Sequence, residues 1–388
     1  MIKLDPTNLT KQTDEYLNEM KDVIRKNYLK ERYASNPVIN PFTKEPVTKL
    51  FERSGTLDEI LLDTLLTGTF SNMISRYASL RDYIQTCRLV YYSSFKIHTE
   101  LEMDNLEKTQ MEREDFRERY TDRYASSWFE PIKSTHSSYK RNDKFFNAFI
   151  DEVEADLTLL NEGIGRIVNY SMLPDEIRHS LLSQMGVEVC PYCNRQYITH
   201  YHDGTKFKTT ADLDHFYPKS VFMLLSLSLF NFVPSCHICN SRFKLAKGIE
   251  IMYPYDEGFM DDARFKYVFA RQGSIDSIIG ASTDFSIELE MNGTGSSPRL
   301  LQNGADMFKL QKLYQSHKEC VREILYKKQA YAKAYQNDLQ ALLGQMGLDQ
   351  LSQNEMNLFK YGYTLDPNEL GKRPLSKLAY DVIRQIQN

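Results

Sequence analysis

The chain has 388 residues, of which 41% are hydrophobic and 26% are charged, a composition that fits a globular protein of two or three domains. Its formal net charge of −4 excludes a global positive field, so any contact with nucleic acid depends on a local basic patch or on a partner. The sequence has no apolar signal segment, no uncharged run long enough to span a membrane, and too few cysteines for a disulfide framework. We therefore expect a cytoplasmic protein with no membrane partner.

Helical periodicity dominates the first part of the sequence. Apolar residues recur at helical spacing from Asp14 to Arg32, and the stretch from Leu57 to Phe95 has the same pattern. Charged helices are expected to continue to about Val168. Gly163-Ile-Gly165 within them is interpreted as a helix irregularity and not as a phosphate-binding loop. We predict an all-helical N-terminal domain over residues 1–185.

The middle of the sequence changes to strand-forming residues. Arg195–His202 is rich in strand formers, Asp203-Gly204 suits a hairpin turn, and Lys206–Thr210 can return as the paired strand. The segment Asn240–Lys247 then predicts a short helix. Together these elements predict a compact module over residues 186–255.

The last part of the sequence combines strands and helices. Phe265–Ala270 and Phe285–Met291 favour two strands, which form a small hairpin region. Apolar residues at helical spacing return from Leu310 to Ile324, and again between Pro374 and Asn388. Residues 256–388 are therefore expected to hold short strands followed by C-terminal helices.

Four of the six cysteines form two tight pairs, Cys190-Pro-Tyr-Cys193 and Cys236-His-Ile-Cys239. A single pair of this kind is weak evidence, but two pairs supply the four thiolates of a closed tetrahedral zinc site. A redox role for the first pair would need a βαβ setting, whereas this pair lies in a hairpin region. The sequence therefore predicts a structural Zn²⁺.

The residues between and beside the cysteine pairs suit phosphodiester hydrolysis. His215 can deprotonate a water molecule, because the unperturbed pKa of imidazole is near neutrality. Asp214 and the side-chain oxygen of Asn240 can hold a catalytic Mg²⁺ or Mn²⁺, which prefer oxygen ligands. A zinc knuckle at Cys236–Cys239 would bring these two distant residues together.

Asp214-His215, Asn231 and the Cys236–Asn240 segment resemble the HNH endonuclease motif on a ββα-metal fold, in its zinc-containing form. The resemblance covers roughly Val189 to Lys247. It implies that His215 is the general base and that Asn231 orients the loop that carries this histidine. It also implies that Asp214 and Asn240 bind the catalytic metal, that the four cysteines bind zinc, and that the substrate is DNA or, less often, RNA.

A longer resemblance connects the chain to the HNH subunits of bacterial anti-phage systems. It depends on three stretches, namely Asp212-Leu-Asp-His-Phe-Tyr-Pro-Lys-Ser220, Val233-Pro-Ser-Cys236 and Tyr253-Pro-Tyr-Asp-Glu-Gly258. One departure from a minimal motif is the apolar run from Val221 to Phe230, which we expect to pack against the helical domain. Because the net acidic chain would bind DNA poorly alone, we expect a regulatory ATPase or sensor subunit as a partner.

Several charged residues and histidines lie close to the motif without belonging to it. The segment from Cys190 to Glu250 holds seven Lys or Arg residues against four acidic residues, a mild basic patch. Asp212 either supports the residues of the site from behind or is an exposed strand residue, and His237 is expected to be exposed to solvent. The candidates for phosphate contact are Lys219, Arg242, Lys244 and Lys247.

The predicted fold is therefore α+β: a mainly helical protein with a central zinc-stapled ββα-metal HNH module and a small β-hairpin region after it. The predicted function is a metal-dependent endonuclease acting on DNA, as a defence effector controlled by a partner. The alternative is a zinc-stapled module that binds nucleic acid or protein without catalysis. Asp214, His215 and Asn240 separate the two hypotheses, since a pure binding module does not need them.

Overall fold

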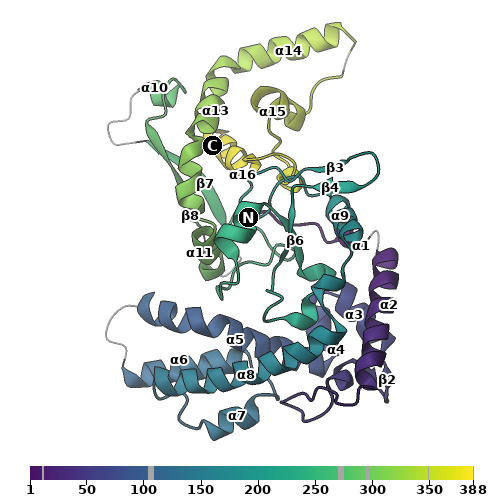
Figure 1. The fold of residues 1–388 in the computed structure, drawn as a ribbon. Coiled ribbons are helices and arrows are strands. Elements are labelled where there is room, and N and C mark those ends of the chain that lie inside the picture. Colours follow the sequence, from purple (N-terminus) through teal and green to yellow (C-terminus); the bar gives the residue numbers. More distant parts are fainter. Residues whose placement is uncertain (11–12, 104–108, 270–274, 293–297, 348, 388) are drawn as a thin grey trace.

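The computed structural model describes residues 1–10, 13–103, 109–269, 275–292, 298–347 and 349–387. The chain is mainly helical, and its strands form small two-stranded antiparallel sheets. Figure 1 shows a helical body built from the N-terminal segment, a central region around β6, and a C-terminal part that carries β7, β8 and the last helices. Buried apolar side chains from all three parts belong to one packed cluster. In the described part of the chain, no helix combines the length and the apolarity needed to cross a membrane.

The N-terminal part is mainly helical, but it is not all-helical as predicted, because a short antiparallel strand pair lies within residues 52–57. Its long helix α8 buries apolar residues at intervals of three and four, among them Phe146, Phe149, Val153 and Leu157, and packs against α2 and α5. The helices are α1 (Thr7–Thr10), α2 (Thr13–Arg32), α3 (Glu59–Thr67), α4 (Phe70–Arg76), α5 (Ala78–Met103), α6 (Gln110–Arg123), α7 (Glu130–Thr135), α8 (Asp143–Ile167) and α9 (Asp175–Gln184). Short elements among them are η1 (Val47–Phe51), η2 (Tyr170–Met172), β1 (Glu52–Arg53) and β2 (Thr56–Leu57).

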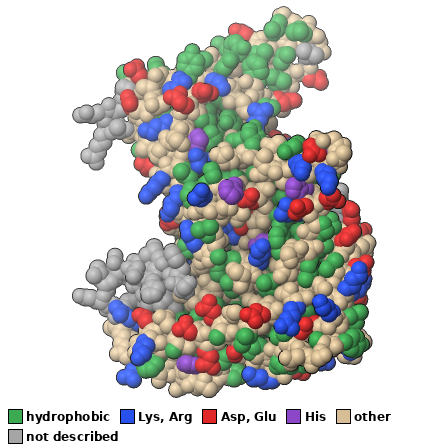
Figure 2. All heavy atoms as spheres, in the orientation of Figure 1, with side chains coloured by type: hydrophobic (Ala, Val, Ile, Leu, Met, Phe, Trp, Pro, Cys, Tyr) green, Lys and Arg blue, Asp and Glu red, His purple; other side chains and the backbone are tan. Residues whose placement is uncertain are grey.

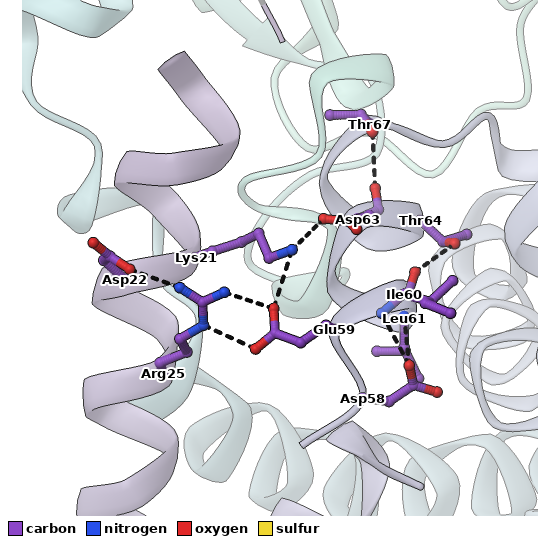
Figure 3. Close-up of polar contacts among 10 residues, drawn as sticks. All are labelled: Lys21, Asp22, Arg25, Asp58, Glu59, Ile60, Leu61, Asp63, Thr64 and Thr67. Carbon is purple, nitrogen blue, oxygen red and sulfur yellow. Dashed lines mark hydrogen bonds and ion pairs between the residues drawn. The ribbon is translucent and has the colours of Figure 1, made fainter. Parts of the chain in front are cut away.

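Ion pairs join α2 to α3 at the surface of the helical body (Figure 3). Both guanidinium nitrogens Nε and Nη2 of Arg25 lie 2.8 Å from the carboxylate oxygens of Glu59. Lys21 Nζ bridges Glu59 and Asp63 at 3.0 and 2.5 Å. The Arg25 hydrogen bond, with help from Lys21, lowers the pKa of Glu59 to about 2. These contacts fix the orientation of α2 against α3.

The central part contains the predicted hairpin and a second strand pair. β3 (His200–His202) pairs with β4 (Phe207–Thr209), which confirms the hairpin around Asp203-Gly204. β5 (Asp212–His215) pairs with β6 (Phe232–Ser235), with His215 opposite Phe232. The connection contains η3 (Met223–Leu225) and η4 (Leu229–Asn231). After β6, the chain forms a π-helix, η5 (Cys239–Lys244), where the sequence predicts a helix over Asn240–Lys247.

The C-terminal part is built on the predicted hairpin of β7 (Ala263–Phe269) and β8 (Phe285–Met291), and the last helix packs against β7. Inside this helix, the buried Lys377 and Asp381 form an ion pair, and Asp381 also accepts a hydrogen bond from the Phe265 backbone. The helices are α10 (Ile275–Ile278), α11 (Pro298–Met307), α12 (Leu310–Leu313), η6 (Tyr314–His317), α13 (Lys318–Ala330), α14 (Lys333–Gln345), α15 (Gln353–Tyr361), η7 (Pro367–Glu369) and α16 (Ser376–Gln387).

Replacement by alanine is expected to have opposite effects on stability at two glycines of α8, Gly163 and Gly165. A Cβ at Gly163 would lie 2.7 Å from Val38 Cγ1 and 2.9 Å from Val47 Cγ2, whereas the nearest atom to a Cβ at Gly165 is Met223 Cε at 3.7 Å. Gly165→Ala should stabilise the protein by about 1 kcal/mol through helix propensity. Gly163→Ala should destabilise it by about 1 to 2 kcal/mol, since overpacking outweighs that gain. Urea unfolding of both variants measures the difference, and equal stability would contradict the packing described.

Candidate functional site

The two cysteine pairs meet in one buried cluster. The sulfur atoms of Cys190, Cys193, Cys236 and Cys239 all lie within 4.8 Å of one another, and all four residues are buried. Tetrahedral zinc with bonds of 2.3 Å would place its sulfur ligands about 3.8 Å apart, so the cluster has the size of a zinc site. The residues therefore fit a structural Zn²⁺, as the sequence predicts. Within the described ranges, no other group of three or more Cys, His, Asp or Glu ligand atoms converges in this way.

The first cysteine pair is a tight turn that the C-terminal part holds in place. The Asn194 N–H donates to the Cys190 carbonyl at 2.8 Å, and Asn194 adopts a left-handed φ of 50°. The Asn194 side chain then donates to the Leu370 carbonyl at 2.8 Å and accepts from the Lys377 N–H at 2.9 Å. Tyr314 donates its hydroxyl to the Cys193 carbonyl at 2.8 Å. The first cysteine pair is thus tied to the beginning of α16 and to η6.

His215 lies at the end of β5 with its ring enclosed by aromatic side chains. The ring centroid is 4.7 Å from that of Tyr170 and 5.2 Å from that of Phe232. Nε2 lies 3.0 Å from the Ser226 carbonyl, which only an Nε2–H can satisfy by donating. Burial lowers the pKa of His215 to about 4, with the Ser226 contact acting against that shift. The imidazole is therefore neutral near pH 7, with its proton on Nε2 and an electron pair on Nδ1.

Asn231 closes the loop between β5 and β6. It is fully buried, and its Oδ1 accepts a hydrogen bond from the Tyr217 N–H at 2.8 Å. Its Nδ2 donates to the carbonyls of Tyr217 and Leu225 at 3.0 and 3.1 Å. These three bonds tie Asn231 to Tyr217 near the start of the loop and to Leu225, the residue before the Ser226 carbonyl that the histidine contacts. The geometry is what a residue that orients this loop requires.

The apolar run of the same loop packs on the helical body, as expected. Asn161 of α8 donates from Nδ2 to the Val221 carbonyl at 2.8 Å and accepts from the Tyr83 hydroxyl at 2.8 Å. Tyr83 of α5 in turn accepts from the Leu224 N–H at 3.1 Å. The helical body therefore holds the loop that positions His215.

Asp214 belongs to a buried network and not to an open site. Its Oδ1 lies 3.0 Å from Lys244 Nζ, and its Oδ2 accepts from the Tyr192 hydroxyl at 2.6 Å. Lys244 also donates to the His215 carbonyl at 2.7 Å. The side chains of Asp214 and Lys244 are only 4% and 3% exposed. The structure thus places Lys244, a candidate for phosphate contact, in the interior.

Asp212 is the carboxylate that contacts Asn240. Its Oδ2 lies 3.0 Å from Asn240 Nδ2 and 3.0 Å from His237 Nδ1, and its side chain is 30% exposed. These three residues border a cavity of about 440 Å³. The other residues that line this cavity are Tyr170, Arg178, His179, Leu182, Thr209, Ala211, Leu213 and Ser241. Sequence reasoning did not single out Arg178, His179 or Tyr170, because they lie before the motif, and no spacing links them to it.

The remaining candidates for phosphate contact are exposed. Lys219 Nζ lies 4.4 Å from the centroid of the Tyr170 ring, which itself contacts His215. Arg242 and Lys247 are exposed on and after η5. Figure 2 shows Lys, Arg and His side chains gathered across the middle of one face, between the helical body and the C-terminal part.

Comparisons with protein-family models, with curated proteins and with solved structures found no match for this chain. The residues and contacts described above are therefore the grounds for a functional assignment.

Zinc binding predicts a large effect of removing one thiolate. Cys239→Ala should abolish the one equivalent of zinc and lower the melting temperature by at least about 10 °C, because metal binding contributes directly to folding free energy. Cys87→Ala removes a buried thiol outside the cluster and should retain the zinc. Metal analysis by mass spectrometry and thermal unfolding measure both effects. Equal zinc content in the two variants would contradict the site.

The buried Asp214–Lys244 pair predicts a strong dependence of stability on both charges. Lys244→Met leaves Asp214 buried without its cation and should cost about 3 to 5 kcal/mol. The double variant Lys244→Met/Asp214→Asn removes both charges and should recover much of that loss. The exposed Lys247→Met serves as the control, with a change of less than about 0.5 kcal/mol. If urea unfolding gives Lys244→Met and Lys247→Met the same stability, the network described is wrong.

Proposed function

We propose that the protein is a metal-dependent endonuclease of the HNH type that hydrolyses phosphodiester bonds of DNA. The observation that carries this proposal is the state of His215, a neutral imidazole whose Nε2–H is anchored on Ser226. In the described residues, no hydrogen bond engages its Nδ1. A base for hydrolysis needs this free electron pair.

The setting of His215 adds to this proposal. Two antiparallel strands and a short helix follow one another, with Cys236 directly after β6 and Cys239 at the first position of η5. This order agrees with the ββα arrangement that the motif implies. Asn231 holds the loop around the base, and Lys219 lies on the Tyr170 ring that the base contacts. A substrate phosphate near His215 could therefore meet a positive charge.

A divalent cation would supply charge neutralisation at the phosphate. The expected ligand pair of Asp214 and Asn240 does not fit that role in this structure, because Lys244 and Tyr192 occupy the Asp214 oxygens and Asn240 contacts Asp212. His215 nevertheless can accept the proton of an attacking water through Nδ1.

A second candidate function is a zinc-stapled module that binds nucleic acid or protein without catalysis. The observation that favours it is that the candidate base lies apart from the other polar residues. His215 does not line the cavity that Asp212, His237 and Asn240 border. A binding module would use the zinc cluster and the exposed basic side chains alone.

Cleavage assays with a histidine variant separate the two functions. Supercoiled plasmid DNA and labelled RNA are incubated with Mg²⁺ or Mn²⁺, with EDTA as the blank. We expect metal-dependent cutting of DNA by the wild type and a loss of at least about 100-fold in His215→Ala, since a general base contributes about 10²- to 10⁴-fold. His202→Ala, on the exposed β3, should cut like the wild type. A fully active His215→Ala would overturn the nuclease, and binding of DNA without cutting would favour the module.

We further propose that a regulatory ATPase or sensor protein controls this nuclease in anti-phage defence. The net charge of −4 makes the isolated chain a poor DNA binder. In addition, α14 buries none of its residues, and Tyr335, Leu342 and Met346 on and after it are exposed. Figure 1 shows α14 at the far end of the C-terminal part, and Figure 2 shows hydrophobic side chains gathered there. Size-exclusion chromatography with the product of the adjacent gene tests this partner.

A further inference from the structure

We propose that Asp212, His237 and Asn240 form the divalent-cation site of this protein, in place of Asp214 and Asn240. The inference deepens the proposed function, because it assigns the cofactor of the same module, but its test does not depend on cleavage. It starts from the disagreement between the expected ligand pair and the contacts that the structure shows.

Asp214 is not free to bind a cation. Both of its carboxylate oxygens are engaged, one by the Lys244 ammonium at 3.0 Å and the other by the Tyr192 hydroxyl at 2.6 Å. Lys244 already neutralises the charge of Asp214, and the two side chains are almost completely buried. A cation at Asp214 would have to displace a buried ammonium that also binds the His215 carbonyl, and would leave that ammonium without its partner.

Asp212, by contrast, has possible ligand atoms converging on it. Its Oδ2 lies 3.0 Å from His237 Nδ1 and 3.0 Å from the Asn240 amide. Neighbouring ligands of an octahedral cation with bonds of 2.1 Å lie about 3.0 Å apart, so a cation can replace these two hydrogen bonds without moving Asp212 away from His237 or Asn240. The Asn240 amide presents its oxygen to a cation after a flip of the side chain, since amide nitrogen and oxygen are assigned by their partners. His237 binds through Nδ1 when its proton is on Nε2.

The three residues come from elements that the zinc cluster holds together. Asp212 begins β5, His237 lies between Cys236 and Cys239, and Asn240 directly follows Cys239. Two of the three ligands are therefore within one residue of a thiolate of the cluster, which limits their movement. Their side chains border the cavity of about 440 Å³, and that of Asp212 is 30% exposed. Positions remain open for water or for a substrate phosphate, and Arg178 and His179 line the same cavity.

The ligand set selects the class of cation. One carboxylate oxygen, one imidazole nitrogen and one amide oxygen suit Mn²⁺ better than Mg²⁺, because Mg²⁺ strongly favours oxygen ligands and water. We therefore expect the site to bind Mn²⁺ in preference to Mg²⁺.

The test measures Mn²⁺ binding by electron paramagnetic resonance of free Mn²⁺, with the zinc-loaded full chain and no nucleic acid. We expect Asp212→Asn and His237→Ala to weaken binding by about 100-fold or more, since even the loss of a residue that only hydrogen-bonds to a metal ligand costs about 10- to 100-fold. Two surface controls on the β3–β4 hairpin, Asp203→Asn and His202→Ala, should bind like the wild type. The double variant Asp214→Asn/Lys244→Met removes both charges of the buried pair, so neither charge is left without its partner. This variant should bind Mn²⁺ like the wild type. Zinc content and circular dichroism establish that each variant is folded.

Three results would overturn the assignment. The first is loss of Mn²⁺ in the Asp214→Asn/Lys244→Met variant together with wild-type binding in Asp212→Asn. The second is absence of Mn²⁺ binding by the wild type, which leaves the cleavage test with Mg²⁺ to judge the nuclease separately. The third is an Asp212→Asn variant that binds Mn²⁺ normally but loses DNA cleavage, because Asp212 and His237 would then act as a proton-transfer pair.

Discussion

The buried carboxylate of Asp214 is the contact on which the central module depends. It accepts hydrogen bonds from Tyr192, which lies between the first two cysteines, and from Lys244, which ends η5. The strand, the first knuckle and the helix therefore meet at one ionised group. A charge in such a position is stable only when its partners are held in place, and the thiolate cluster provides that rigidity. The cysteine cluster, which fits a structural Zn²⁺, and this ion pair are thus two parts of one constraint, since each fixes the groups that the other needs.

A second set of contacts extends from the helical body to the histidine. Tyr83 and Asn161 hold the loop at Val221 and Leu224, and Asn231 ties the same loop to Tyr217. The Ser226 carbonyl accepts the hydrogen bond from the imidazole Nε2–H. The N-terminal helices therefore do more than cover the module. Because they fix the position of the Ser226 carbonyl, they also fix which nitrogen of His215 carries the proton. The helical body is in this sense part of the candidate site, although it lies outside the stretch from Val189 to Lys247 that carries the resemblance.

Local sequence patterns predicted much of this arrangement. The spacing of the cysteines led to the cluster, the turn residues Asp203-Gly204 led to the β3–β4 hairpin, and helical periodicity led to α2 and α16. These features depend on neighbours in the sequence. Local patterns could not predict which of the two carboxylates, Asp212 or Asp214, is buried. Asp212 and Asp214 lie on the same face of a strand by alternation, and which of them is buried depends on Lys244, about 30 positions later.

Lys244 and the apolar loop show the same limit. A lysine after a cysteine pair has the sequence properties of a solvent-exposed phosphate contact, and only the fold shows that Lys244 is internal. Similarly, the prediction that the apolar loop packs on the helices was general, whereas the hydrogen bonds to Tyr83 and Asn161 join residues that no spacing rule connects. The role of His215 as a base stays a prediction that chemistry supports and that cleavage must decide.

The π-helical form of η5 limits changes in the length of the segment that follows Cys239. The Leu245 N–H donates to the Asn240 carbonyl at 3.0 Å, five residues back, so this turn holds one residue more than an α-helical turn closed at the same carbonyl. With that extra residue, Asn240 faces the cavity, Lys244 faces the interior, and Arg242 stays outside. Deleting one residue between Cys239 and Lys244 would restore the α-helical register and rotate the lysine away from Asp214. The segment can therefore accept changes of side chain at its exposed positions, but its length is fixed.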